Sequence, residues 1–200
     1  MDPELYVFPR INSAPLKLAA STALFVLVLV VAGLLVPLLP GPRLWQAVDR
    51  PLTTGAASVS LAGLLHMLLG YSLFLYGSYH AWQATRLKNS VQHVHHELAT
   101  RLLDTGYYAR ARHPMYGMFI LANAGLGLAM NSVYGLAFSL LSLVLFVANG
   151  IFEERAVMIR FFGDEYRAYM RRVTARYFTP GQAVALVLVL ALNISGYLFR

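Results

Sequence analysis

The chain has 200 residues, of which 58% are hydrophobic and only 12% are charged. Soluble domains carry roughly 25% charged residues, so this composition excludes an ordinary soluble domain and indicates an integral membrane protein in a single unit. The formal net charge of +7 does not indicate nucleic-acid binding, because the cations lie beside apolar segments. The absence of cysteine excludes disulfides, thiolate metal sites and cysteine nucleophiles.

Long apolar segments predict membrane-spanning helices, because about 20 helical residues cross the hydrocarbon core. The third and fourth segments are joined only by Asn131-Ser132, which predicts an antiparallel helical hairpin. The last segment is short and only marginal as a span. We therefore predict an all-α polytopic membrane bundle of four to five spans, in a single domain over residues 1–200. The predicted spans are 18–39, 55–79, 114–130, 133–152 and 182–199.

The polar stretch between the second and third spans contains several histidines. Apolar residues at helical spacing over 87–102 predict an amphipathic helix at the membrane surface. His93, His95 and His96 match no common zinc-ligand spacing, so we predict no metal site. His66 lies inside the second span, where a histidine is either functional or hydrogen-bonded to a neighbouring helix.

The lysines and arginines divide unequally between the two sides of the membrane. With the N-terminus in the cytoplasm, thirteen cations lie in inside segments and three in outside segments. By the positive-inside rule, segments 80–113 and 153–180 face the cytoplasm. We expect a multi-pass protein, as in a bacterial inner membrane, with its site on the cytoplasmic side.

The segment before the hairpin, 102–116, combines cations, tyrosines and a proline. Pro114 suits the first turn of a helix, so Arg112 and His113 should lie at the helix N-terminus. The free N–H groups and the dipole there favour an anion. The alternative interpretation is a basic pair that merely ends a cytosolic loop.

Two adjacent carboxylates, Glu153 and Glu154, lie at the other end of the same hairpin. The hairpin should bring them close to Arg112 and His113, among several tyrosines and phenylalanines. A ligand with a carboxylate, an ammonium and a flat ring would find a partner for each group there. S-adenosylmethionine carries all three, and its sulfonium would also gain from aromatic faces.

The combined motifs resemble those of the integral-membrane methyltransferases, which include isoprenylcysteine carboxyl methyltransferases and phospholipid methyltransferases. The similar region covers about 80 residues, 102–180, within a catalytic core near 80–180. Its motifs are Gly106, Tyr108, Arg112-His113-Pro114 and Tyr116; then Glu153-Glu154, Phe162-Gly163, Glu165-Tyr166 and Tyr169; and finally Arg176 and Pro180.

The resemblance implies that S-adenosylmethionine binds in a cytoplasmic pocket between the hairpin end and the C-terminal tail. It implies that the glutamates hold the amino-acid end of the cofactor and that the 103–108 loop covers the adenine. It also implies that Arg112 and Arg176 orient the loop and tail or bind an acidic substrate. The implied residues are Arg112, His113 and Glu153 for catalysis; Leu103, Gly106, Tyr108, His113, Tyr116, Glu153 and Glu154 for the cofactor; and Asn123, Asn149 and Arg176 for the substrate.

The methyl acceptor and two other functions stay open at this point. The acceptor is expected to be a lipophilic small molecule or lipid, with either a prenylcysteine-type carboxylate or a phospholipid amine as the reacting group. Integral-membrane sterol reductases resemble the same C-terminal motif and use NADPH, for which the tail arginines could hold a phosphate. A non-enzymatic membrane protein of the same fold is the third interpretation.

Overall fold

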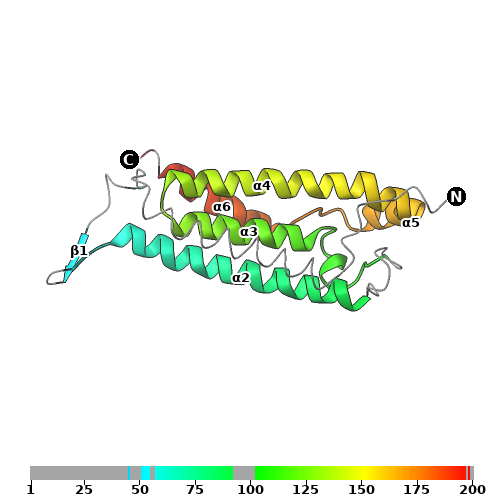
Figure 1. Ribbon diagram of the computed structural model, residues 1–200, viewed down its shortest axis with the longest axis horizontal. Coiled ribbons are helices and arrows are strands. Elements are labelled where there is room, and N and C mark those ends of the chain that lie inside the picture. Colours follow the sequence, from blue (N-terminus) through cyan, green and yellow to red (C-terminus); the bar gives the residue numbers. More distant parts are fainter. Residues whose placement is uncertain (1–44, 46–50, 55–56, 92–101, 197, 199–200) are drawn as a thin grey trace, which may run out of the picture. The chain divides into compact units, whose positions relative to one another are not determined.

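The centre of this computed structural model is an antiparallel hairpin of two apolar helices, α3 (Pro114–Ala129) and α4 (Val133–Glu153) (Figure 1). α3 begins where the sequence predicts, with Pro114 in its first turn, where a missing N–H costs no hydrogen bond. Ser132 caps α4 by accepting a hydrogen bond of 3.2 Å from the Gly135 amide. Asn131 adopts the left-handed conformation, with φ of 44°, at this reversal. The hairpin agrees with the prediction.

The structure describes residues 45, 51–54, 57–91, 102–196 and 198, all of which belong to the unit formed by residues 41–200. The predicted first span, 18–39, lies outside the described residues. The histidine cluster at 93, 95 and 96 also lies outside them.

The second predicted span begins and ends later than the sequence predicts. Pro51–Thr54 (β1) and Ala57–Ser60 (β2) form a short antiparallel hairpin, and α2 then runs over Leu61–Val91. The predicted span 55–79 was therefore wrong for residues 57–60, which form β2 rather than helix. α2 continues past Tyr79 because its polar last turns are still made of good helix formers. The predicted amphipathic helix over 87–102 starts inside this last part of α2.

α2 packs against α3 along two glycines that lie two turns apart. A Cβ atom on Gly70 would lie 2.5 Å from the Gly125 carbonyl oxygen, and one on Gly77 would lie 2.7 Å from the Met118 carbonyl oxygen. Real Cβ atoms do not approach so closely, so only glycine allows these two backbones to touch. Small residues serve helix packing in membranes in this way.

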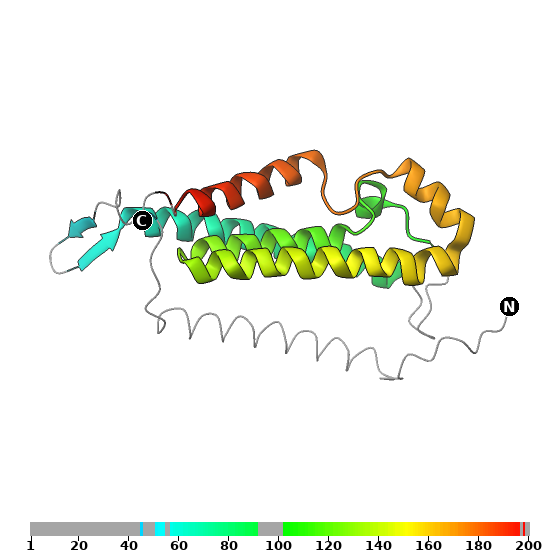
Figure 2. The same ribbon diagram turned by 90° about the horizontal axis from the view of Figure 1, so that it is seen from above.

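The chain changes direction after α4. A π-helical turn, Glu154–Met158, leads into α5 (Ile159–Arg172), which is kinked at Gly163 with φ of 54° and ψ of −121°. Only glycine adopts such a conformation readily. Figure 2 shows α5 returning toward the 102–113 segment, and the chain then passes into α6 (Pro180–Ser195), which packs on α3 and α4.

Among the described residues, two helices are long and apolar enough to cross a membrane: α2, and α4 with its continuation. α3 and α6 have 16 residues each and are shorter apolar helices. The described part of the chain is therefore a helical bundle with two long candidate spans and two shorter apolar helices.

Candidate functional site

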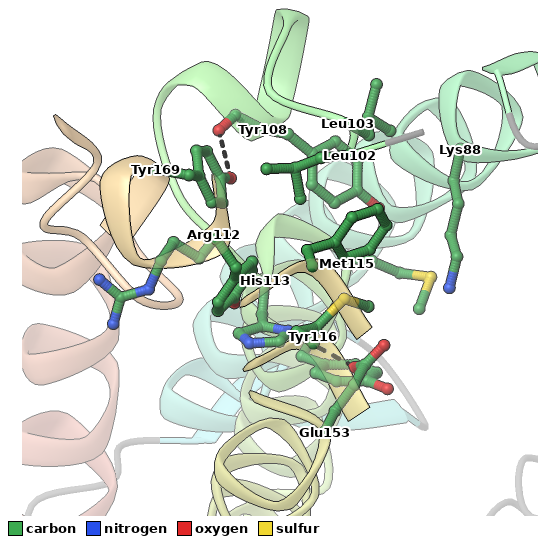
Figure 3. A pocket seen from close by; sticks show the side chains of 13 residues that line it. Lys88, Leu102, Leu103, Tyr108, Arg112, His113, Met115, Tyr116, Glu153 and Tyr169 are labelled. Atoms are coloured by element: carbon green, nitrogen blue, oxygen red, sulfur yellow. Dashed lines mark hydrogen bonds and ion pairs between the residues drawn. The ribbon is translucent and has the colours of Figure 1, made fainter. Parts of the chain in front are cut away.

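A cavity lies at the open end of the hairpin, where α2, α3, α4 and α5 meet the 102–113 segment (Figure 3). Its volume, on the scale used for protein cavities, is about 50 Å³. The wall consists of Lys88, Leu102, Leu103, Tyr108, Arg112, His113, Met115, Tyr116, Glu153, Met158, Phe162, Tyr166 and Tyr169.

The connection between α5 and α6 closes the site from one side. The Arg112 and His113 amides donate hydrogen bonds to the carbonyls of Ala175 (3.0 Å) and Arg176 (2.7 Å). A Cβ atom on Gly117 would lie 2.0 Å from the Tyr177 carbonyl oxygen, so glycine is required where this connection crosses α3. The connection between α5 and α6, which we call the tail, is thereby held directly over the N-terminus of α3.

His113 lies between the two adjacent carboxylates that the sequence singles out. Its Nδ1 is 3.5 Å from a Glu153 oxygen, and its Nε2 is 3.3 Å from a Glu154 oxygen. Burial by itself lowers the pKa of His113, but the two carboxylates outweigh it, so the pKa lies above its usual value of 6.5. The ring therefore bridges the end of α4 and the start of the π-helical turn.

Glu154 is the centre of a buried charge cluster and does not line the cavity. It accepts a hydrogen bond from Arg112 Nε at 2.8 Å, and its other oxygen lies 3.0 Å from an Arg176 nitrogen. Glu154 is only 3% exposed, and the Tyr166 hydroxyl lies 3.4 Å from the Glu154 carboxylate. Two arginines thus neutralise Glu154 and bind the tail to the hairpin.

Arg112 is therefore engaged within the protein. Besides Glu154, its Nη1 donates to the Val173 carbonyl at 2.9 Å, and its guanidinium turns away from Glu153 (Figure 3). The predicted anion site at the start of α3 is thus filled by the chain's own glutamate. Arg112 and Arg176 both contact Glu154, and Arg112 also contacts the backbone after α5.

Glu153 differs from its neighbour because its carboxylate faces the cavity. Among the ion pairs of the described residues, Glu153 makes only the longer contact, 3.5 Å, with His113. Lys88 extends along the same cavity from the last turns of α2 (Figure 3). Glu153 can therefore accept further hydrogen bonds from a ligand.

Tyrosines fix the remaining wall. The Tyr169 hydroxyl donates to the Tyr108 carbonyl at 2.6 Å, which attaches α5 to the 102–113 segment. Burial, and after it the charge of Glu153, raises the pKa of the Tyr108 phenol, so this side chain stays protonated. The Tyr116 ring stacks on His113 with 5.6 Å between ring centroids. These aromatic faces surround the Glu153 carboxylate.

The structure brings most, but not all, of the expected site residues to the cavity. Leu103, Tyr108, Arg112, His113, Tyr116 and Glu153 line it, whereas Glu154 and Arg176 lie behind it. Gly106 faces a different hollow. Asn149 donates to the Tyr116 hydroxyl at 2.9 Å rather than orienting Glu153, and Asn123 donates to Ser142 within the hairpin.

Sequence reasoning missed several residues of the wall. Lys88 was assigned to a surface helix because the second span was expected to end near residue 79. Met115 and Met158 carry no recognisable signal in a single sequence. The missed wall residues are Lys88, Leu102, Met115, Met158, Phe162, Tyr166 and Tyr169.

The apolar helices define a helical membrane protein, and its cavity combines a carboxylate with aromatic rings, the groups that attract organic cations. The chain belongs to the phospholipid methyltransferase family, whose family model matches residues 65–165. Members of this family use S-adenosylmethionine as the methyl donor.

A curated relative supports the same assignment over a shorter region. The chain is 42% identical over 73 residues to protein-S-isoprenylcysteine O-methyltransferase from Schizosaccharomyces pombe. This region is 36% of the chain and 30% of the yeast protein, so the chain matches less than a third of that relative's length. No solved structure matches the chain significantly.

The cavity residues fit S-adenosylmethionine by the chemistry of their groups. The Glu153 carboxylate suits the ammonium, and Lys88 suits the carboxylate of the same amino-acid end. The faces of Tyr108 and Tyr116 suit the sulfonium. The Nε2 atom of His113 is buried without a well-aligned hydrogen-bond partner. Such an atom is available to a hydrogen bond from a bound ligand or water.

Proposed function

We propose that this chain is an integral-membrane enzyme that transfers the methyl group of S-adenosylmethionine to a lipophilic acceptor. The observation that carries the proposal is the difference between two neighbouring carboxylates. Glu154 is neutralised by two arginines, whereas Glu153 faces a cavity lined by aromatic rings. Such a carboxylate suits a cationic cofactor.

The residues of the cavity would bind the cofactor and exclude water. When bound, S-adenosylmethionine supplies a methyl group on a sulfonium, and transfer to an acceptor oxygen or nitrogen leaves a neutral thioether. Glu153 would hold the ammonium, and Lys88 the carboxylate. Leu103 would cover the adenine, and Tyr108 and Tyr116 would face the sulfonium. Positioning and exclusion of water account for most of the catalysis of such a displacement.

His113 has two roles in this proposal. Between Glu153 and Glu154, it would hold the Glu153 carboxylate in place. If the acceptor is an amine, the neutral form of His113 or the Glu153 carboxylate would remove its proton before attack. A carboxylate acceptor would need no such step.

The other expected residues would act indirectly. Glu154 would hold Arg112 and Arg176 and so keep the tail over the site. Asn149 would orient Tyr116 through its hydrogen bond. Gly106, with φ of 59°, would allow the loop before Tyr108 to turn. Asn123 would support the hairpin near the acceptor.

The acceptor and the orientation belong to the same proposal. The family description names a phospholipid and the yeast relative's name an isoprenylated cysteine, so an acceptor of one of these two lipophilic classes is proposed. The excess of cations in segments 80–113 and 153–180 supports a site that faces the cytoplasm.

The test is cofactor binding and methyl transfer by the purified full chain in neutral detergent. S-adenosylmethionine should bind by titration calorimetry, and its labelled methyl group should enter a lipid extract, where mass spectrometry identifies the product. Glu153→Gln should weaken binding, while Glu165→Gln, an exposed carboxylate outside the cavity wall, should not. Binding of NADPH in place of S-adenosylmethionine would favour the reductase and refute the proposal.

A further inference from the structure

The surface of the molecule combines aromatic and cationic side chains where α4 passes into the π-helical turn and α5, at the bend that Figure 2 shows. Phe152 and Phe161 are 59% and 45% exposed there. Arg155 and Arg160 are exposed as well, and neither forms an ion pair with any residue that the structure describes. We call these four residues the α4–α5 corner.

The α4–α5 corner continues the apolar surface of a helix that can cross a membrane. Leu141, Leu145 and Phe152 follow one another on one side of α4 at helical spacing, and they are 57%, 58% and 59% exposed. α4 with its continuation is one of the two long candidate spans among the described residues. An apolar stripe that ends in an aromatic residue and is followed by arginines is typical of the point where a span reaches the lipid head groups.

The opposite side of the same segment belongs to the cofactor site. Met158 and Phe162, which are four residues apart, line the cavity, and so does Glu153 at the end of α4. Arg160 and Phe161 therefore lie on the outside of a backbone segment whose inner side forms part of the cavity wall. Whatever holds the α4–α5 corner in place also holds this part of the wall.

We propose that the α4–α5 corner binds the head groups of anionic lipids in the adjoining leaflet, and that this contact tightens the binding of S-adenosylmethionine. The two arginines would pair with lipid phosphates, and the two phenylalanines would enter the layer between the head groups and the acyl chains. The leaflet would then hold the π-helical turn, and with it Glu153, in the orientation that the structure shows. The second part of this inference rests on the proposed function, because it concerns the cofactor of that site.

The position of the α4–α5 corner can be measured without any cofactor. Because the chain contains no cysteine, a spin label can be attached to Phe161→Cys or to the control Arg171→Cys, an exposed position on α5. The labelled full chains are inserted into nanodiscs of phosphatidylcholine mixed with the anionic phosphatidylglycerol. In power-saturation EPR, the label at position 161 should collide more with oxygen, which concentrates in lipid, and the label at position 171 more with a water-soluble nickel chelate.

The coupling to the cofactor site is measured as the Kd for S-adenosylmethionine of the full chain, in the same nanodiscs and in nanodiscs of phosphatidylcholine alone. One arginine beside an anionic surface contributes about a factor of five, so two can tighten the binding by up to about 25-fold. We expect a several-fold lower Kd with the anionic lipid, and no change when inorganic phosphate is added to the neutral nanodiscs. High salt should reduce the difference between the two lipid compositions.

Matched variants assign the effect to the α4–α5 corner. The double variant Arg155→Gln/Arg160→Gln should bind S-adenosylmethionine equally in both kinds of nanodisc. It should also keep its Tm, since neither arginine forms an ion pair with a described residue. The control Arg167→Gln/Arg171→Gln removes the same charge from α5 beyond the kink at Gly163 and should keep the lipid effect.

Three results would overturn the inference. A label at position 161 that meets the nickel chelate as readily as one at position 171 would show a solvated or protein-binding surface. Equal Kd values for the unmodified chain in the two kinds of nanodisc would refute the coupling. Loss of the lipid effect in both double variants alike would show a general attraction of the net charge. Failure to bind S-adenosylmethionine in any nanodisc would instead refute the proposed function, and the EPR measurement would still decide where the corner lies.

Discussion

The two adjacent glutamates should respond in opposite ways to the same substitution. Glu153→Gln keeps the shape of the side chain but removes the charge that faces the cavity. A charge-assisted hydrogen bond contributes about 1.5–3 kcal/mol, so the affinity for S-adenosylmethionine should fall roughly 10- to 150-fold. The stability without cofactor should change little, because the nearest ion pair of Glu153 is the 3.5 Å contact with His113.

Glu154→Gln should instead damage the fold. It leaves the buried Arg112 guanidinium, with a side chain only 9% exposed, without its carboxylate. Breaking a buried pair costs about 3–5 kcal/mol. Arg176 is 40% exposed and should contribute little to this cost, since water can solvate it. We therefore expect a loss near the lower end, about 3 kcal/mol, which corresponds to a Tm lower by roughly 6–12 °C.

The assay is the Tm of each purified variant in detergent, with and without saturating S-adenosylmethionine, together with the Kd from calorimetry. Glu165→Gln serves as the control for removing one exposed carboxylate from α5. The reasoning would be refuted if Glu153→Gln bound the cofactor normally and melted early. It would equally be refuted if Glu154→Gln kept its Tm and lost only cofactor affinity.

Three further predictions follow from the pKa of one residue, the packing of another and the charge distribution. The pKa of His113 is higher in the folded state than in the unfolded state, so the protonated ring stabilises the fold fully below about pH 6.5. This stabilisation is lost as the pH rises through the folded-state pKa. His113→Gln should therefore flatten the fall in Tm above about pH 6.5. Gly117→Ala should lower the stability by about 1–3 kcal/mol in denaturant titrations, because the tail backbone crosses there, whereas Gly181→Ala should be neutral; equal effects would contradict this. A single cysteine at Asn89 should react with an impermeant reagent only from the cytoplasmic side and one at Gln46 only from outside, and the reverse labelling would refute the orientation.

The hairpin could be predicted because its signals are local. Pro114 and Ser132 fix where α3 and α4 begin, and uncharged residues fill the helices between them. The strands at 51–60 could not be predicted, because a short apolar run does not distinguish strand from helix without its partners. The end of α2 was missed for the same reason, and with it Lys88.

The site was predictable in membership more than in roles. The sequence places Arg112, His113, Glu153 and Glu154 at one end of the hairpin, as the structure does. It does not reveal which glutamate faces inward, since adjacent helical residues point about 100° apart and the π-helical turn changes that direction. Nor does it reveal that Arg176, more than sixty residues from Arg112, shares the same carboxylate.

The glycine contact between α2 and α3 limits how solutes can reach the cofactor cavity. At Gly70 and Gly77 backbone meets backbone, so the two helices should act as a fixed wall. On another side, Arg172 of α5 and Asp104 of the loop form an exposed ion pair. Exposed ion pairs are weak and are screened by salt. Exchange of a bound cofactor should therefore become faster as ionic strength rises. The loop and α5 would separate more easily, while α2 and α3 would stay fixed.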